Sequence, residues 1–324
     1  MKIIVTGCAG FIGFHVSKKL LEEKNNIVIG IDILNDYYNV EQKKESLNEL
    51  LQYDNFSFYK EDIVNTRLIE IEQPDKVCHL AAYAGVRYSI ENPCLYARVN
   101  IEGFVNLVEQ ACKANTKTFV YASSSSVYGL EQKVPFQEDF QINSCNSPYA
   151  VSKRCKEMYA EMYHRLYGIS MIGLRFFTVY GPKGRPDMAP YKFLQSILDG
   201  TPITQYGCGE SKRDYTYIDD VVDGILAALK NQKQLKCEVI NLGNSKPISL
   251  TDFIKTCEKI SKKKPTIQIH KEQIGDVPMT FADIHKAKEL LDYDPQTNLE
   301  YGLEKTYLWL YERNYLKKRN TTLK

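Results

Sequence analysis

The chain has 324 residues, of which 44% are hydrophobic and 25% charged, and its formal net charge is +2. This length suits one large domain or two unequal ones, and the composition is that of an ordinary soluble globular enzyme. The near-neutral charge gives no electrostatic reason to expect nucleic acid or an anionic membrane as a partner, and no apolar run approaches the ~20 residues that span a bilayer.

A short apolar run at residues 3–5 precedes a glycine-rich stretch at residues 6–13. The run is typical of a strand that is covered on both faces of a parallel sheet. The glycines have the spacing G-x-x-G-x-x-G, which lets the backbone approach a pyrophosphate while the next helix binds its charge. A purely structural turn is the alternative, because the spacing alone is weak evidence. The predicted cofactor residues of this stretch are Gly7, Gly10, Phe11, Ile12 and Gly13.

The next predicted strand, Ile27–Ile31, ends at Asp32. This position is close to the ~20-residue offset at which a carboxylate binds the adenosine ribose of a dinucleotide. Asp32 would repel a 2′-phosphate and no arginine follows it, so we expect NAD rather than NADP. A third strand, Phe56–Tyr59, ends near Asp62 and Ile63, which could lie beside the adenine.

The alternation of strands and helices continues with strands at residues 77–80 and 118–122. It predicts an α/β fold with a Rossmann-type, doubly wound parallel sheet. Ligands of such sheets gather at the carboxyl ends of the strands. His79 is expected to be a core residue rather than a ligand. The fifth strand runs into four serines, of which Ser124 could hydrogen-bond a reacting oxygen, although a serine-capped turn is the alternative.

Tyr149 and Lys153 form the candidate catalytic pair. The preceding Ser147–Pro148 dipeptide resembles a helix N-cap and first residue, which places both side chains one turn apart on one helix face. An ammonium within about 4 Å, at an effective dielectric of ~20, would favour the phenolate by roughly 4 kcal/mol. We therefore predict that Lys153 lowers the pKa of Tyr149 from ~10 toward neutrality. The same spacing at Tyr301 and Lys305 is assigned to an ordinary C-terminal helix.

The glycine stretch, Asp32, Ser124 and Tyr149-x-x-x-Lys153 occur in an order that resembles the extended short-chain dehydrogenase/reductase family, in its nucleotide-sugar branch. The resemblance implies that Tyr149 is the acid/base, that Lys153 binds the nicotinamide ribose, and that Ser124 assists. It covers essentially the whole chain. A non-catalytic Rossmann protein that senses the cofactor is the alternative, but such relatives typically lose the tyrosine.

Several further stretches are similar to UDP-glucuronate 4-epimerases. They are residues 31–38, 84–93, 175–182, 184–190 and 275–278. Within them, Thr178 stands where UDP-galactose epimerases usually have asparagine. Two positions depart from the group: Cys8 replaces a usual alanine, and Tyr83 replaces a usual glutamine near the sugar or nicotinamide.

A uronic acid brings an extra carboxylate, for which Arg185 offers a bidentate partner of matching charge and Thr178 a hydrogen bond. Arg87 is a second cation that could serve the same anion, and a surface salt bridge is the alternative for either arginine. By resemblance, the remaining substrate residues are Ser125, Ser126, Arg213 at the UDP pyrophosphate, and Asp276 near the uridine ribose.

The resemblance implies NAD-dependent C4 epimerisation of a UDP-sugar, most closely of UDP-glucuronate to UDP-galacturonate. Tyr149 would take the C4 hydroxyl proton while NAD⁺ accepts the C4 hydride, which then returns to the other face of a transient 4-keto sugar. A UDP-glucose or UDP-N-acetylglucosamine 4-epimerase is the first alternative, and a UDP-glucuronate decarboxylase is the second. A 4,6-dehydratase is disfavoured, because serines stand at 125 and 126 where that branch has an Asp–Glu pair.

We expect an NAD-binding domain and a smaller UDP-sugar-binding domain. The first comprises residues 1–178 and a returning segment, 215–243; the second comprises 179–214 and 244–324. By resemblance, helices near 93–114 and 148–168 form the contact of a homodimer. Residues 1–6 lead directly into a strand and a glycine loop, so we expect no signal peptide. Nine cysteines without a CxxC pair or a Cys/His cluster favour reduced thiols in the cytoplasm and no metal site.

Overall fold

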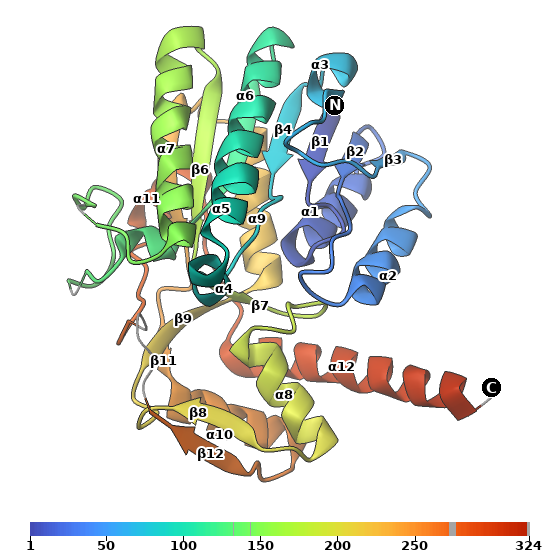
Figure 1. Cartoon of the computed structure of the whole chain (residues 1–324), viewed down its shortest axis with the longest axis vertical. Coiled ribbons are helices and arrows are strands. Elements are labelled where there is room, and N and C mark those ends of the chain that lie inside the picture. The colour runs from blue at the N-terminus through green and yellow to red at the C-terminus, as the bar shows by residue number, and fades with distance from the viewer. Residues whose placement is uncertain (132, 143, 272–276, 323–324) are drawn as a thin grey trace.

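At the centre of the computed structural model, which describes residues 1–131, 133–142, 144–271 and 277–322, lies a seven-stranded sheet (Figure 1). All its neighbouring strands are parallel, in the order β10-β6-β5-β4-β1-β2-β3. The predicted doubly wound α/β fold is confirmed. The strands are β1 (Lys2–Thr6), β2 (Ile27–Ile31), β3 (Phe56–Tyr59), β4 (Lys76–His79), β5 (Thr118–Ser124), β6 (Ser170–Phe176) and β10 (Cys237–Leu242).

Successive side chains of the central strands point into two separate hydrophobic cores, as the two-residue period of a strand requires. In β1, Ile3 and Val5 belong to one core and Ile4 to the other, and all three are fully buried. One core contains α1 (Phe11–Leu21), α2 (Val40–Leu50), α9 (Ile218–Lys230) and α11 (His285–Leu291). The other contains α3 (Leu68–Glu72), α6 (Gly103–Lys113) and α7 (Pro148–Tyr167).

A smaller part of the molecule lies beyond the carboxyl ends of the sheet strands (Figure 1). It contains the three-stranded sheet β11-β9-β7 and the two-stranded sheet β12-β8. Its strands are β7 (Thr178–Tyr180), β8 (Ile203–Tyr206), β9 (Lys212–Tyr217), β11 (Pro247–Ser249) and β12 (Ile267–His270). Its helices are α8 (Ala189–Asp199), α10 (Leu250–Ser261) and α12 (Leu299–Thr322).

Short helical segments border the space between the two parts. They are α4 (Val86–Glu91), α5 (Pro93–Tyr96), a π-helical turn η1 (Ala97–Glu102) that runs into α6, and a 3₁₀ turn η2 (Ser125–Tyr128) after β5. π-helical turns often occur near functional sites. These segments therefore mark the edge of the sheet at which ligands of doubly wound folds bind.

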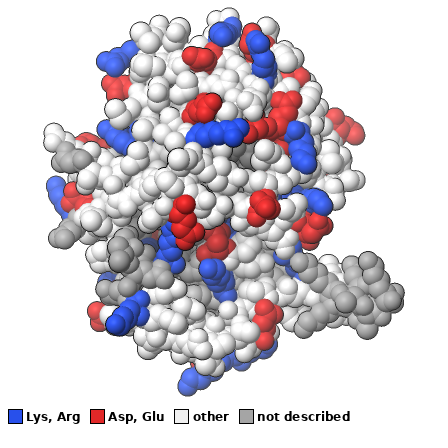
Figure 2. Space-filling view, viewed as in Figure 1, with Lys and Arg blue, Asp and Glu red and all other residues white. Residues whose placement is uncertain are grey.

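Charged side chains of both signs are interspersed over the face seen in Figure 2, with no large area of a single sign. This agrees with the small net charge of +2. In the part of the chain that the structure describes, no helix is both long and apolar enough to cross a membrane.

Candidate active site

The turn between β1 and α1 requires its glycines. Gly7 has a φ of +74° and donates its N–H to the Ile31 carbonyl at 2.7 Å. At Gly13, a Cβ atom would lie 2.0 Å from the Gly7 oxygen, so a side chain there cannot be accommodated without moving the backbone. Gly10 is the N-cap of α1 and supplies no side chain. The turn therefore brings bare backbone to the N-terminus of α1, which is the arrangement that binds a dinucleotide pyrophosphate.

Asp32 lies directly after β2, and its carboxylate is held by backbone donors. The two oxygens accept the N–H of Ala9 at 3.1 Å and of Leu34 at 2.8 Å. Burial raises the pKa of Asp32, while the N–H of Leu34 and the charge of Lys43 oppose this rise. The effect of Lys43 on Asp32 was not predicted, because Lys43 lies on α2 and is distant from Asp32 in the sequence.

A cavity of about 1450 Å³ runs from the glycine turn to the smaller part of the molecule. Pockets for one small ligand typically have volumes of ~300–1,000 Å³, so this cavity has room for two ligands. Its walls contain every predicted site residue within the described part of the chain; Asp276 lies outside the described residues. These residues are Gly7, Gly10, Phe11, Ile12, Gly13, Asp32, Asp62, Ile63, Arg87, Ser124, Ser125, Ser126, Tyr149, Lys153, Thr178, Arg185 and Arg213.

Tyr149 and Lys153 lie on α7, which begins as predicted. The Ser147 hydroxyl caps this helix by accepting the N–H of Ala150 at 3.1 Å. The Lys153 ammonium donates to the Ala122 carbonyl at 2.9 Å and lies 5.5 Å from the centre of the Tyr149 ring. Burial lowers the pKa of Lys153 to about 7. The amine is therefore only partly charged at neutral pH.

The pKa of Tyr149 differs from the prediction. Although the residue as a whole is only partly buried, the protein around its hydroxyl desolvates it and raises this pKa. A hydrogen bond with Ser124 and the positive charge of Arg185 lower it, but they do not outweigh desolvation. The prediction that Lys153 lowers the pKa of Tyr149 is wrong in this structure. The physical reason is that the Lys153 amine donates to the Ala122 carbonyl and itself loses charge on burial.

Ser124, the last residue of β5, has the capping role that was considered as the alternative for it, and its role toward a reacting oxygen stays a prediction. Its hydroxyl accepts the N–H of Ser126 at 3.2 Å and lies 3.2 Å from the Ser126 hydroxyl, so it caps the η2 turn. The same hydroxyl makes the hydrogen bond that lowers the pKa of Tyr149. The serine-rich turn thus places one hydroxyl beside the phenol.

Arg185 lies on the loop that follows β7, close to Tyr149. Its Nε donates to Asp187 at 2.9 Å, a second nitrogen also contacts the Asp187 carboxylate, and Nη2 donates to the Tyr37 hydroxyl at 3.2 Å. The charge of Arg185 lowers the pKa of both Tyr149 and Lys153. The guanidinium therefore lies near the reactive end of the cavity. Sequence reasoning missed both partners; Tyr37 could have been noticed as part of the stretch 31–38.

The loop that carries Arg185 is fixed to helices of the large sheet. The Gln42 side chain on α2 donates to the carbonyls of Lys183 at 2.9 Å and Gly184 at 3.0 Å. His15 on α1 lies 2.9 Å from the Pro182 carbonyl. These contacts hold the backbone immediately before Arg185.

Other predicted residues have clear positions on the cavity wall. Arg87 is exposed and its guanidinium lies 5.2 Å from the Tyr206 ring. Arg213 is on β9 and donates to the Lys212 carbonyl at 2.9 Å. Thr178 is the first residue of β7.

Tyr83 belongs to a group of tyrosine rings beside the cavity. Its ring centre lies 5.6 Å from that of Tyr37, 6.4 Å from Tyr88 and 6.1 Å from Tyr96. Aromatic packing of this kind stabilises the wall near Arg185, which gives the departure at position 83 a local structural role.

His79 is fully buried, as predicted. One ring nitrogen lies 2.8 Å from the Thr6 hydroxyl and the other 3.0 Å from the Lys156 amine. Among the described residues, no group of three or more His, Cys, Asp or Glu side chains could hold a metal ion.

The strand order of the large sheet and the residues that line the cavity place the protein in the class of short-chain dehydrogenase/reductase-type enzymes. Residues 3–243 match the family described as the NAD dependent epimerase/dehydratase family, and the chain belongs to that family.

Known proteins similar to this chain include a UDP-glucuronate 4-epimerase of Thermodesulfobacterium geofontis, which is 44% identical over 94% of this chain and 95% of its own. The structure is similar to that of a Bacillus cereus UDP-glucuronic acid 4-epimerase in complex with UDP-glucuronic acid and NAD. The TM-score is 0.93 and the identity 39%, covering 96% of this chain and 99% of the other. A Thermotoga maritima UDP-glucose 4-epimerase with UDP-glucose has a TM-score of 0.88 and 33% identity, covering 97% and 99%.

Proposed function

We propose that the protein catalyses the NAD-dependent C4 epimerisation of UDP-glucuronate to UDP-galacturonate. The main supporting observation is a single cavity that contains the glycine turn at one end and Tyr149, Ser124 and Arg185 at the other. The high similarity to UDP-glucuronate 4-epimerases over nearly the whole chain supports the same function.

The residues present fit NAD. The bare backbone of Gly7, Gly10 and Gly13 suits the pyrophosphate, the Asp32 carboxylate suits the adenosine ribose diol, and Asp62 and Ile63 lie on the cavity wall for the adenine. When bound, NAD⁺ supplies a positively charged ring that accepts a hydride reversibly. Lys153 would bind the nicotinamide ribose, as the resemblance implies.

Tyr149 takes the proton of the sugar C4 hydroxyl and later returns it to the same oxygen, once the configuration at C4 is inverted. Ser124 stabilises the phenolate by donating a hydrogen bond, and Arg185 stabilises it by its charge. Burial raises the pKa of Tyr149, and Ser124 and Arg185 each reduce that rise and so favour the phenolate form.

Arg185 and Thr178 bind the carboxylate of the uronate. Asp187 already forms a two-pronged contact with Arg185, so the substrate carboxylate exchanges with or shares that contact. The 4-keto intermediate of a uronate is a β-keto acid, which loses CO₂ when its carboxylate is suitably aligned. Arg185 and Thr178 hold the carboxylate out of that alignment.

The remaining substrate residues bind the nucleotide and the sugar. Arg213 neutralises the UDP pyrophosphate, and Arg87, Ser125 and Ser126 complete the pocket; Asp276, which lies outside the described residues, is assigned to the uridine ribose by resemblance alone. The NAD-binding domain then comprises residues 1–178 and 215–243, and the UDP-sugar-binding domain comprises 179–214 and 244–324.

A homodimer in the cytoplasm is part of the proposal. α6 and α7 lie side by side on one face of the molecule (Figure 1). Several apolar side chains of α7 are exposed, with Val151 46%, Met158 60% and Leu166 65% accessible. A stripe of this kind favours a helix-to-helix contact with a second copy. All nine cysteines are free, as suits a reducing compartment.

The proposed function is tested by incubating the protein with UDP-glucuronate without an added hydride acceptor and following the sugar by ¹H NMR. We expect UDP-galacturonate to accumulate to equilibrium. A UDP-pentose would indicate a decarboxylase instead. Turnover of UDP-glucose with none of UDP-glucuronate would favour the second candidate, a UDP-glucose 4-epimerase, to which the Thermotoga maritima structure is the supporting similarity.

A further inference from the structure

Three consecutive residues at the end of β5 contact three residues that lie one turn apart on α7. The Lys153 amine donates to a carbonyl at 2.9 Å, a serine hydroxyl donates to Glu157 at 2.6 Å, and a second serine hydroxyl hydrogen-bonds Tyr149. The three pairs are Ala122 with Lys153, Ser123 with Glu157, and Ser124 with Tyr149. Each of the three residues at the strand end thus has a partner on the same helix.

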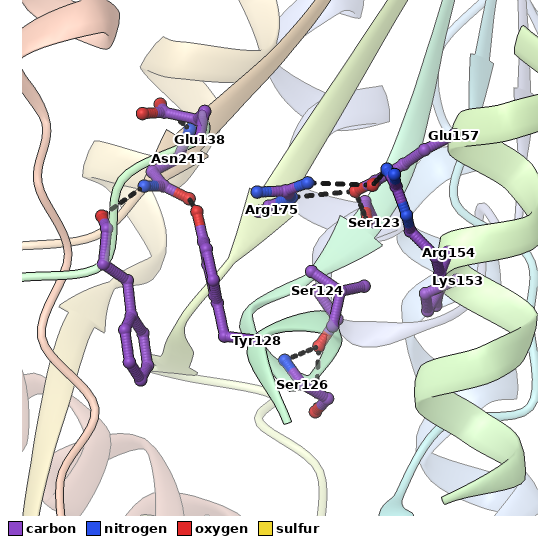
Figure 3. A network of polar contacts seen from close by, with 12 residues as sticks. Ser123, Ser124, Ser126, Tyr128, Glu138, Lys153, Arg154, Glu157, Arg175 and Asn241 are labelled. Carbon is purple, nitrogen blue, oxygen red and sulfur yellow. Dashed lines mark hydrogen bonds and ion pairs between the residues drawn. The ribbon is translucent and has the colours of Figure 1, made fainter. Parts of the chain in front are cut away.

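Glu157 is buried, as Lys153 is, and it makes further contacts besides the one with Ser123. Arg175 on β6 binds it in a two-pronged arrangement, with Nε to Oε1 at 2.8 Å and Nη2 to Oε2 at 2.9 Å (Figure 3). The exposed fractions of the two side chains are only 2% for Arg175 and 1% for Glu157. Burial favours the protonated acid, but Arg175 and Ser123 outweigh it and keep the pKa of Glu157 below its usual value.

Arg175 also reaches the far end of the serine turn. Its guanidinium lies 4.8 Å from the centre of the Tyr128 ring, and the Tyr128 hydroxyl donates to Asn241 at 2.7 Å (Figure 3). Tyr128 ends the η2 turn that Ser124 caps. The buried pair therefore contacts the segment 123–128 at both ends, with Glu157 at Ser123 and Arg175 at Tyr128.

Stability alone does not explain a buried ion pair. Desolvating two charges opposes their attraction, and apolar residues of similar volume often replace such a pair without loss of stability. One nitrogen of Arg175, Nη1, is moreover buried without a hydrogen-bond partner among the residues that the structure describes. The pair instead supplies directed contacts between three elements: β5, β6 and α7.

We propose that Glu157 and Arg175 are positioning residues that fix the end of β5 against α7, and so hold the Ser124 hydroxyl against the Tyr149 phenol. This inference rests on the proposed function for its effect on turnover. Its geometric content, the contact between Ser124 and Tyr149, can be measured separately.

The test uses the cofactor-loaded protein and three variants. Glu157→Gln removes the charge that binds Arg175 and weakens the hydrogen bond with Ser123. Ser123→Ala removes that hydrogen bond but leaves the ion pair between Glu157 and Arg175. Arg154→Met is the matched control, because Arg154 binds the same carboxylate at 2.9 Å from its exposed side, with 39% of its own side chain accessible. Should Glu157→Gln fail to fold, the apolar double variant Glu157→Leu with Arg175→Met replaces it.

Two readouts are combined. The ¹³Cζ resonance of Tyr149, assigned with Tyr149→Phe, reports the hydrogen bond to its hydroxyl without any substrate. We expect it to move in Glu157→Gln and Ser123→Ala and to stay in place in Arg154→Met. The pH profile of kcat for epimerisation should shift to higher pH in the same two variants. Their kcat at neutral pH should fall roughly 10- to 100-fold, as misplacement of a reacting group by ~1 Å does, with KM changed less than about twofold.

The outcomes separate the two proposals. A Tyr149 resonance that is identical in wild type, Glu157→Gln and Ser123→Ala would overturn the positioning role, whether or not the protein epimerises UDP-glucuronate. A resonance that moves in a protein without epimerase activity would support the positioning role and contradict the proposed function. A lower melting temperature with an unchanged resonance and pH profile would show that the pair is structural only.

Discussion

The residue that decides the chemistry is Tyr149, and two neighbours oppose the effect of its burial. Ser124 lowers the pKa of Tyr149 by a hydrogen bond, and Arg185 lowers it by its charge. In Ser124→Ala the phenolate loses its donor, so the pKa of Tyr149 rises and the rising limb of kcat against pH moves to higher pH. The expected loss in kcat at neutral pH is of order 100-fold, within the range for proton-transfer groups. An unmoved pH limb would contradict the role of Ser124.

Arg185 is the residue on which selectivity for a uronate depends. Hydrogen bonds to charged groups contribute about 1.5–3 kcal/mol, so Arg185→Ala should raise KM for UDP-glucuronate roughly 10- to 100-fold and allow a UDP-pentose by-product. Asp187→Asn is the control, because it removes the intramolecular partner but leaves the guanidinium. NMR of the products measures both effects. Unchanged selectivity without any pentose would remove the role assigned to Arg185.

At the scale of elements, a comparison of two helices shows why spacing alone cannot identify a catalytic pair. Lys305 lies 5.2 Å from the Tyr301 ring on α12, almost the same distance as in the Tyr149–Lys153 pair, which is 5.5 Å. The two pairs differ in burial: in the α12 pair Tyr301 is 50% exposed, whereas in the α7 pair Lys153 is only 2% exposed. What distinguishes the α7 pair is the strand end packed against it, which no local pattern of residues reveals.

Lys153 on α7 makes the free energy of unfolding of the chain depend on pH in a predictable direction. Its pKa is about 7 in the folded chain and near ~10.4 in an unfolded one. The unfolded state therefore binds more protons between these values, and folding stability rises with pH across that window. Urea unfolding at several pH values should show wild type gaining stability relative to Lys153→Met from pH ~7 to ~10. A difference that is constant over this range would contradict the low pKa of Lys153.

The glycine turn gives a prediction for the β1–α1 unit. Gly13→Ala places a methyl group 2.0 Å from the Gly7 oxygen, so the turn must move and NAD binding should be lost. Gly168→Ala is the control: its φ of +72° strains alanine, but no atom lies within 4 Å of the added Cβ. That control should cost roughly 1 kcal/mol of stability and leave NAD affinity unchanged. Titration of protein fluorescence with NAD distinguishes the two variants, and tight binding by Gly13→Ala would refute the role of the turn.

Most elements of the sheet were predictable, since their signals are local. β2 and β3 have the predicted bounds, and the returning segment contributes β10 to the large sheet as expected, where it pairs with β6. The short helix α4, at residues 86–91, was not predicted, and its N-cap, Gly85, makes no side-chain cap hydrogen bond that could have indicated it. The pKa of Tyr149 was predicted in the wrong direction, because burial depends on the tertiary structure and not on spacing.

At the scale of the whole molecule, the cavity is built by both parts of the chain. Arg185 belongs to a loop of the smaller part, yet Gln42 and His15 hold that loop on helices of the large sheet. The site residues were predictable from motifs in order along the chain. Their partners Asp187, Glu157 and Arg175 were not recognised, because a partner is defined by distance in space.

The proposed homodimer also belongs to this scale. A charge introduced into the exposed apolar stripe of α7 would have to be desolvated on association, which opposes it. Met158→Glu should therefore give a monomer, while Leu308→Glu on α12, at a side chain 45% exposed, should leave the dimer intact. Sedimentation velocity measures both. A wild-type chain that sediments as a monomer would contradict the proposed contact.

The central claim is tested most directly with UDP-glucuronate that carries deuterium at C4, incubated with the protein without added hydride acceptor. The account predicts UDP-galacturonate in which the deuterium remains at C4, because the atom removed from one face of the sugar returns to the other within the cavity. Loss of the label to solvent, or formation of a UDP-pentose in place of UDP-galacturonate, would contradict it.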